Sequence, residues 1–285
     1  MTGAPAGGSR RGTAVRGGAR SRRTGGAAPA LLLVPALVGL AFLLVPLLGL
    51  VLRAPWGELP ARLASPEVLG ALRLSLVCAT AATALSLLLG VPLAWLLARS
   101  TFPGKRLVRA LVTVPLVLPP VVGGVALLLV FGRRGLVGEH LHEWFGVSLP
   151  FTTGAVVLAE TFVAMPFLVV SVEGALRAAD VRLDEAAATL GASRWVTFRR
   201  VTLPLVAPGV AAGAVLAWTR ALGEFGATIT FAGNFPGRTQ TMPLAVYLAM
   251  ESNPEAAIVL SLVLLLVSVA VLALLRERWM GGASR

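Results

Sequence analysis

Residues 180–208 read DVRLDEAAATLGASRWVTFRRVTLPLVAP, an arginine-rich segment that joins the apolar block 151–172 to the apolar block 205–225. Each block has about 20 residues, the length that an α-helix needs to cross the hydrocarbon core of a bilayer. The segment between them therefore lies outside the hydrocarbon, on one face of a membrane. Counting the remaining apolar blocks on either side of this segment predicts the fold.

Apolar blocks of this kind recur along the whole chain of 285 residues, which is 56% hydrophobic and only 13% charged. A soluble domain carries about 25% charged residues, so this composition excludes a soluble enzyme, a secreted disulfide scaffold and a disordered regulator. The single cysteine, Cys78, cannot form an internal disulfide. We predict an all-α polytopic membrane protein with six transmembrane helices, at 31–52, 69–97, 110–131, 151–172, 205–225 and 256–275.

The positive charges predict the orientation of these six helices. Of the 25 lysines and arginines, 18 lie in the two terminal segments and in the connections 98–109 and 173–203. The positive-inside rule places these parts in the cytoplasm, with both termini, so the net charge of +12 does not indicate a nucleic-acid-binding protein. We expect a disordered basic tail at 1–28, one transmembrane domain at 29–278 and a cytoplasmic tail at 279–285. The first apolar block exceeds the ~7–15 residues of a signal-peptide core, so we expect it to be retained.

Residues 180–208 also carry helix start and stop signals. Asp180 is a suitable N-cap for a short helix over 183–190, and Gly191 can end that helix in the left-handed conformation. Ser193 can cap a second short helix, on which Trp195 and Phe198 form an apolar stripe among arginines. By physical chemistry alone, this helix–turn–helix either docks on another protein or lies on the lipid surface.

The order Glu185-Ala186-Ala187, Gly191, Phe198 and Leu203-Pro204 resembles the EAA loop of the permeases of bacterial ATP-binding-cassette (ABC) importers. The resemblance implies the type I importer permease fold and makes 174–203 the cytoplasmic loop that couples the permease to a separate ATPase subunit. It implies that Glu185 orients the loop through a hydrogen bond to a local arginine. The residues expected to form the coupling loop are Glu185, Ala186, Ala187, Gly191, Ser193 and Phe198.

Three further stretches, 115–124, 161–167 and 220–241, are similar to permeases of oxyanion importers, and the last of them most resembles molybdate permeases. The resemblance implies a multi-pass inner-membrane subunit that forms the pathway for molybdate, with sulfate, thiosulfate and tungstate as alternative substrates. The implied partners are a second copy of this chain, cytoplasmic ABC ATPase subunits and an extracytoplasmic oxyanion-binding protein. ATP and Mg²⁺ would be bound by the ATPase, and no cofactor by this chain.

Residues that could drive chemistry are missing from the sequence. We find no phosphate-binding loop, because Gly104-Lys105 lacks the required upstream glycine, and no nucleophile or catalytic set. His140 and His142 have neighbouring carboxylates but no third ligand group, so we expect a solvated loop and no metal site. A self-contained secondary anion transporter is the alternative from another class, but it would show an internal repeat, and we find none.

The third apolar block contains residues that disrupt helices. Pro115, Pro119 and Pro120 remove backbone donors, and Gly123-Gly124 adds flexibility. A broken helix at membrane depth is tolerated only against protein or a water-filled cavity. We therefore expect Pro119, Pro120 and Gly123 to line the pathway, the alternative being a kink used only for packing.

Two charged residues, Arg220 and Glu224, are predicted to share one face near the outer end of the fifth helix. Charges at such depth are usually paired, so we expect an internal ion pair near the gate. The alternatives are direct contact of Arg220 with the anion and an exposed surface pair. Thr228 and Thr230 offer neutral donors for brief contact with an oxyanion, and Glu160 is expected at the outer interface.

Overall fold

The computed structural model describes residues 30–280, and within this range every regular element is a helix. The predicted tail 1–28 and most of the predicted tail 279–285 lie outside the described residues. The all-α prediction is confirmed. The helices are α1 (Ala30–Leu52), α2 (Leu59–Leu63), α3 (Pro66–Arg99), α4 (Lys105–Val117), α5 (Pro120–Phe131), α6 (Gly138–Phe145), α7 (Thr153–Ala178), α8 (Val181–Thr189), α9 (Arg194–Thr197), the π-helical turn η1 (Phe198–Thr202), α10 (Leu203–Leu222), α11 (Gly226–Phe231), α12 (Met242–Ser252) and α13 (Pro254–Met280).

Among residues 30–280, five stretches of helix are long and apolar enough to cross a membrane, and α4 with α5 makes a sixth if the pair is one span. The prediction of one helix over 110–131 is wrong in detail, because the chain direction changes by 118° between α4 and α5. Leu118 is extended, with φ −68° and ψ 130°, as the residue before a proline prefers. Pro119 and Pro120 then have no N–H to continue the ladder of α4. The predicted break in this block is therefore confirmed.

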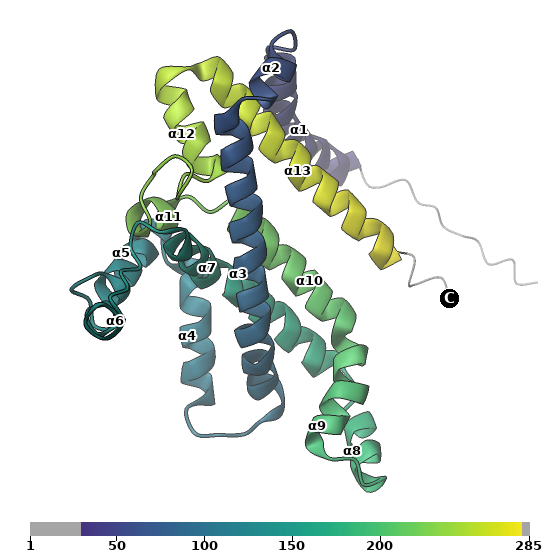
Figure 1. Ribbon diagram of the computed structural model, residues 1–285. Coiled ribbons are helices and arrows are strands. Elements are labelled where there is room, and N and C mark those ends of the chain that lie inside the picture. The colour runs from purple at the N-terminus through teal and green to yellow at the C-terminus, as the bar shows by residue number, and fades with distance from the viewer. Residues whose placement is uncertain (1–29, 281–285) are drawn as a thin grey trace, which may run out of the picture. The chain divides into compact units, whose positions relative to one another are not determined.

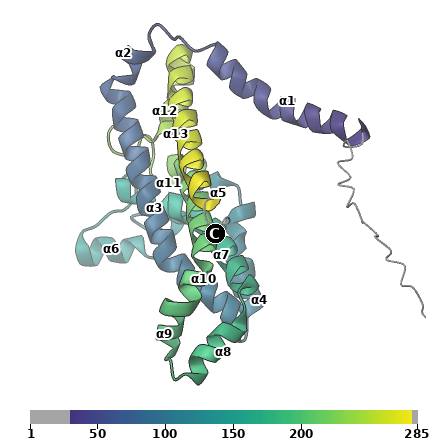
Figure 2. The same cartoon turned by 90° about the vertical axis from the view of Figure 1, so that its right-hand side faces the viewer.

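The core of the unit that begins at Gly49 is built by α3, α7 and α10, which run alongside one another (Figures 1 and 2). Small residues of α3, among them Ala79, Ala82 and Ala94, are fully buried against α7. A Cβ on Gly90 would lie 2.8 Å from Leu168 Cδ2, so the two helices approach closely there. Helix packing in lipid relies on such small residues, since lipid tails are as apolar as leucine. Helix α1 belongs largely to a separate unit, and none of its described side chains is buried.

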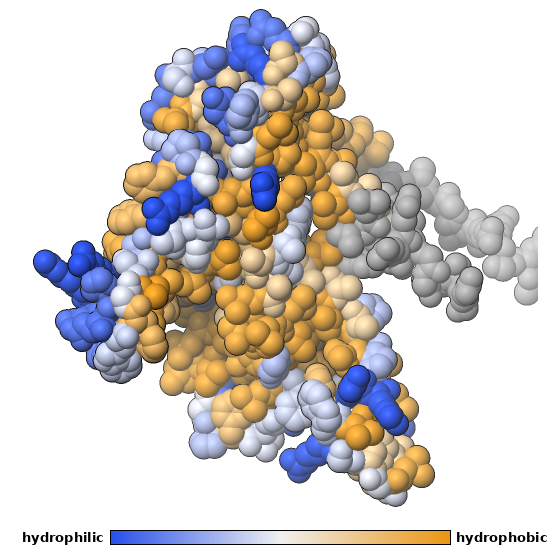
Figure 3. All heavy atoms as spheres, in the orientation of Figure 1, coloured by the Kyte–Doolittle hydropathy of each residue, from blue (hydrophilic) through white to orange (hydrophobic). Residues whose placement is uncertain are grey.

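The unit from Gly49 onward has two distinct ends in Figure 1. One end, here called the α8 end, carries α8, α9 and the connection between α3 and α4. The other, here called the α12 end, carries α2, α12 and the start of α13. In Figure 3, hydrophobic side chains cover the middle of the visible face and hydrophilic ones gather at both ends and over α6. This banding is what a membrane-spanning bundle requires, because lipid solvates its middle and water its ends.

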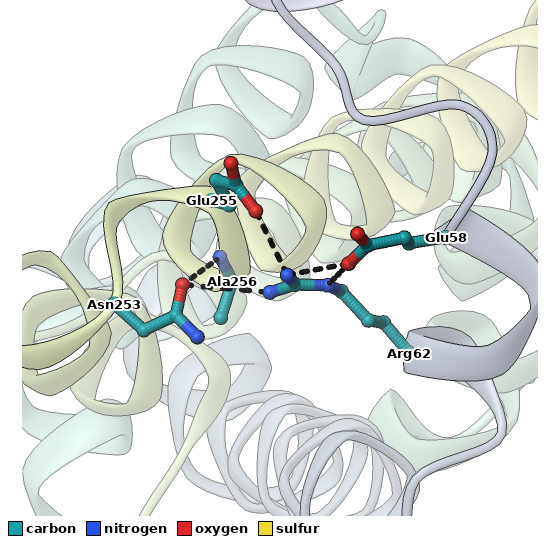
Figure 4. Close-up of polar contacts among 5 residues, drawn as sticks. All are labelled: Glu58, Arg62, Asn253, Glu255 and Ala256. Carbon is teal, nitrogen blue, oxygen red and sulfur yellow. Dashed lines mark hydrogen bonds and ion pairs between the residues drawn. The ribbon is translucent and has the colours of Figure 1, made fainter.

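At the α12 end, a single arginine ties α2 to the start of α13 (Figure 4). The Arg62 guanidinium lies 2.6 Å from the Glu58 carboxylate and 2.9 Å from the Glu255 carboxylate. It also donates a 3.4 Å hydrogen bond to Asn253 Oδ1, which accepts from the Ala256 N–H as well. The connections 133–150 and 226–254 between the apolar blocks contain the helices α6, α11 and α12.

Candidate functional site

Helix α8 and the turn after it have the conformation that the sequence predicts. The Asp180 side chain accepts a hydrogen bond of 3.0 Å from the Arg182 N–H and caps the helix, which begins at Val181, two residues earlier than expected. Gly191 has φ +81°, the left-handed conformation that ends helices at glycine. The Ala192 N–H donates to the Ala187 carbonyl at 3.0 Å, so the turn is closed by backbone hydrogen bonds.

The first two residues of the Glu-Ala-Ala motif on α8, Glu185 and Ala186, are exposed, and Ala187 is half-buried. Leu190 is 89% exposed. Figure 2 shows α8 at the opposite end of this unit from α12. Glu185 forms no ion pair with any described residue.

The neighbour of Glu185, Asp184, holds α8 on the bundle. Its Oδ2 lies 3.5 Å from Arg99 Nη2 at the end of α3, and its Oδ1 accepts a 2.9 Å hydrogen bond from the Thr202 hydroxyl. The expectation that Glu185 orients the loop by pairing with a local arginine is therefore wrong, since Asp184 has this role. Arg99 and Asp184 both line a cavity of about 580 Å³ between α3 and the α8–α9 hairpin.

The second short helix also forms, but it is not a separate element. Ser193 caps α9 through a 3.4 Å hydrogen bond from the Val196 N–H. The helix then continues through η1 into α10 without a break, so residues 194–222 make one stretch of 29 residues. The predicted apolar stripe is confirmed, because the Trp195 and Phe198 rings stack with centroids 5.7 Å apart. A π-helical turn of this kind often occurs at functional positions.

A second set of contacts at the α8 end connects α4 to α7. Glu173 Oε1 lies 2.7 Å from Arg109 Nη2 and 2.7 Å from Arg177 Nη2, and the Glu173 side chain is only 10% exposed. Arg109 also donates to the Leu97 carbonyl of α3 at 3.3 Å. The Glu173–Arg177 pair has the i, i+4 spacing of a helix and could be found in the sequence. The link to Arg109, 64 residues away, could not.

Helices α5 and α11 pack with almost no space between their backbones. A Cβ on Gly124 would lie 2.7 Å from Thr230 Cβ and 2.8 Å from the Ala227 carbonyl oxygen. A Cβ on Gly226 would lie 2.9 Å from Pro120 Cβ. Gly123 is buried beside Phe162, whereas Pro119 and Pro120 are exposed. The broken third block therefore packs on α11 and leaves its two prolines on the surface of this chain.

Arg220 and Glu224 form an ion pair of 2.6 Å, which agrees with the expected internal pairing. The Glu224 side chain is 1% exposed and lies two residues beyond the end of α10, so the two residues do not share one helix. Glu224 Oε1 also accepts a 2.8 Å hydrogen bond from the Ala227 N–H in the first turn of α11. One carboxylate thus joins the end of α10 to the start of α11.

The remaining polar residues of this region are less accessible to an anion than the sequence predicts. Thr228 is fully buried, and the Thr230 hydroxyl donates to the Gly226 carbonyl at 2.8 Å. Glu160 is 1% exposed inside the bundle, so its predicted place at the outer interface is wrong. The reason is that α7 is the central helix of the core and buries side chains on most of its surface.

Comparison with known sequences places most of the chain in a single family. Residues 90–281 match the family described as "Binding-protein-dependent transport system inner membrane component". The chain is 50% identical to "Molybdenum transport system permease protein ModB" of Mycobacterium bovis over 238 residues, which covers 84% of this chain and 90% of that protein. It is 45% identical to ModB of Escherichia coli K12, covering 75% and 94%. A sulfate transport system permease protein, CysT of the same strain, is 35% identical, covering 78% and 82%.

Solved structures show the same fold at low sequence identity. A bacterial ABC transporter involved in the import of the acidic polysaccharide alginate is 19% identical with a TM-score of 0.70, covering 88% of this chain and 94% of that one. The MetNI methionine ABC transporter in an inward-facing conformation is 18% identical with a TM-score of 0.60, covering 75% and 95%. The expected fold, that of ABC importer permeases, is therefore confirmed.

Proposed function

Because the chain belongs to the family of binding-protein-dependent transport system inner membrane components, we propose that it is the permease subunit of an ATP-driven molybdate importer. The assignment of molybdate as the substrate rests on sequence identity. The chain is 50% and 45% identical to two ModB proteins but 35% identical to a sulfate permease. The site itself supports the coupling role, because α8 exposes Glu185 and Ala186 of its Glu-Ala-Ala motif at one end of a bundle of membrane helices.

The coupling loop is proposed to dock on a separate cytoplasmic ABC ATPase. Glu185, Ala186 and Ala187 form the contact surface, and the alanines allow the backbone of the partner to approach closely. Gly191 and Ser193 shape the turn that presents this surface, and Phe198 fixes the following helix through its aromatic contacts. The chain supplies no ATP or Mg²⁺ site in this proposal; both belong to the ATPase.

Movement of α8 has two routes into the bundle. Asp184 links α8 to α3 through its ion pair with Arg99 and to η1 through its hydrogen bond with Thr202. The continuous helix 194–222 connects the coupling loop to the ion pair of Arg220 and Glu224 at the far end of α10, which is the second route for this movement. Glu224 in turn holds α11, which packs on α5. ATP binding in the partner subunits is thereby transmitted to the broken helix pair α4–α5.

The pathway is proposed to form between two copies of this chain, along α5 and α11. Pro119, Pro120 and Gly123 shape α5, and the exposed prolines leave room for a second copy. Thr228 and Thr230 are neutral groups that can meet the anion after α5 and α11 move, and brief contact with neutral donors suits transport, which needs weak sites. Arg220 is neutralised by Glu224, so it positions the gate and does not bind the dianion.

The orientation follows from the position of the cations. The α8 end carries Arg99, Lys105, Arg106, Arg109, Arg177, Arg182, Arg194, Arg199 and Arg200. We place this end, with both termini, in the cytoplasm. The α12 end then faces an extracytoplasmic oxyanion-binding protein that delivers the substrate.

Uptake of radiolabelled molybdate into vesicles tests the proposal. Vesicles that contain this chain, its cognate ATPase and ATP, with the cognate binding protein outside, should accumulate molybdate. Competition by sulfate and by tungstate measures the selectivity for the anion. Preferential uptake of sulfate would overturn the assignment of molybdate as the substrate. Uptake by this chain without an ATPase would identify a secondary transporter and overturn the coupling role.

A further inference from the structure

A narrow aromatic cleft lies between α3 and α9, and of its residues the proposed coupling role uses only Phe198. Its walls are Pro92 and Trp95 of α3, Trp195 of α9 and Phe198 of η1, and it has a volume of about 270 Å³. Phe198 lies between the two indoles, edge-on to Trp95 at 6.3 Å and stacked on Trp195 at 5.7 Å. The cleft remains open to the surroundings, because Pro92 is exposed and Trp195 is 67% exposed.

The cleft has an unneutralised positive rim. Arg194 lines it, and Arg199 and Arg200 follow in the next turns. All three are exposed, and none forms an ion pair with a described residue. This contrasts with Arg99, Arg109 and Arg177 at the same end, each of which faces a carboxylate. An apolar floor with an unpaired arginine, Arg194, at its edge is complementary to an anionic amphiphile.

The cleft also lies near the α8 end of the membrane-spanning helix α3. Trp95 is four residues before the end of α3 at Arg99, so it lies about 6 Å from the end of a membrane-spanning helix. Tryptophan is enriched at the boundary between membrane and water, where its apolar ring and its N–H are both solvated. The cytoplasmic leaflet is the anionic one and attracts arginines at its surface.

We infer that this cleft, formed by Trp95, Trp195 and Phe198 with Arg194 at its rim, binds one anionic phospholipid of the cytoplasmic leaflet. An acyl chain packs on the aromatic walls and the phosphate meets Arg194. The inference rests on the proposed function only for the orientation of the α8 end. The lipid binds beside η1, so it holds the joint between the coupling loop and α10.

Native mass spectrometry of the full-length chain purified in detergent tests this inference without any need for transport. We expect wild-type protein to retain one more phosphatidylglycerol than the Trp195→Ala variant, and to retain no phosphatidylcholine at the same concentration. Arg194→Gln should weaken retention about fivefold, the effect of about 1 kcal/mol per basic residue at an anionic surface. Raising the salt concentration should weaken binding to the wild type more than to this variant.

Trp144→Ala is the matched control, because Trp144 is 71% exposed on α6, a helix that lies apart from α9 in Figure 1. It should retain phosphatidylglycerol as the wild type does. Equal retention by wild type, Trp195→Ala and Arg194→Gln would overturn the inference, as would equal retention of phosphatidylcholine. If Trp195→Ala instead shifts the protein from dimer to monomer with lipid retention unchanged, a second copy fills the cleft and the inference is wrong.

Discussion

Asp184 of α8 lies 3.5 Å from Arg99 of α3, so a residue of the coupling loop is tied directly to the end of a core helix. The side chains of Arg99 and Asp184 are 13% and 25% exposed, which makes the pair better shielded from water than an ordinary surface pair. Since Asp184 also accepts a hydrogen bond from Thr202, one carboxylate joins α8 to both α3 and η1. Its neighbour Glu185 is exposed and forms no ion pair with a described residue.

Replacing Asp184 should separate ATP hydrolysis from uptake. Asp184→Ala removes the attraction to Arg99 and the acceptor for Thr202, so α8 can move without moving α3. We expect molybdate uptake per ATP hydrolysed to fall about fivefold, which corresponds to about 1 kcal/mol for a partly shielded pair. Asp184→Asn keeps an acceptor for Thr202 and should give an intermediate loss. Wild-type coupling in Asp184→Ala would show that the loop is held by other contacts.

Gly191→Val should impair coupling by straining the backbone at residue 191 and not by a steric clash. A Cβ at this position meets nothing within 4 Å, so the substitution causes no clash, but φ is +81°. A residue with a Cβ pays about 1–2 kcal/mol in the left-handed conformation, and a β-branched residue is the least tolerant. We expect normal membrane insertion and yield but uncoupled ATPase activity in reconstituted vesicles. Gly191→Asn is the control at the same position and should retain most of the uptake, because asparagine tolerates this conformation.

Glu224→Ala should destabilise the whole chain. It leaves the Arg220 guanidinium unpaired near the bundle interior and the Ala227 N–H without its acceptor. Breaking a buried pair by removing one partner costs about 3–5 kcal/mol, so the melting temperature in detergent should fall markedly.

The pair Glu58–Arg62 provides the matched control, because it has the same i, i+4 spacing but a Glu58 side chain that is 62% exposed. Glu58→Ala should change stability by at most about 1 kcal/mol. Similar melting temperatures for the Glu58 and Glu224 variants would contradict the structural importance of the buried pair.

Gly124→Val should separate α5 from α11. The added Cβ would lie 2.7 Å from Thr230 Cβ and 2.8 Å from a backbone oxygen, and the backbone cannot give way easily. Overpacking of this kind costs about 1–3 kcal/mol, so we expect lower thermal stability together with lost uptake. Gly174→Ala is the control, since a Cβ on Gly174 meets nothing within 4 Å and its site lies within α7. Stability as high as that of the wild type in Gly124→Val would show that α5 and α11 are less tightly packed than described.

The sequence alone was sufficient for those features that depend on local composition or on neighbours along the chain. Six apolar blocks predicted the membrane helices, and Pro119-Pro120 predicted the break in the third. Asp180, Gly191 and Ser193 predicted the caps and the turn of the coupling loop, because capping hydrogen bonds join residues only two or three positions apart. The pairing of Arg220 with Glu224 was also predicted, although α10 ends at Leu222 and the two residues do not share the helix face expected from their spacing.

Only the tertiary structure decided which distant side chains meet. It gave the anchoring role to Asp184 in place of Glu185, joined Arg109 to Glu173 across 64 positions, and buried Glu160 where an interfacial position was expected. It also set the angle of 118° between α4 and α5, because prolines end a helix but do not determine where the next one points. These features depend on how helices pack in three dimensions. The close approaches of α5 to α11 and of α3 to α7 have no counterpart in the order of the residues.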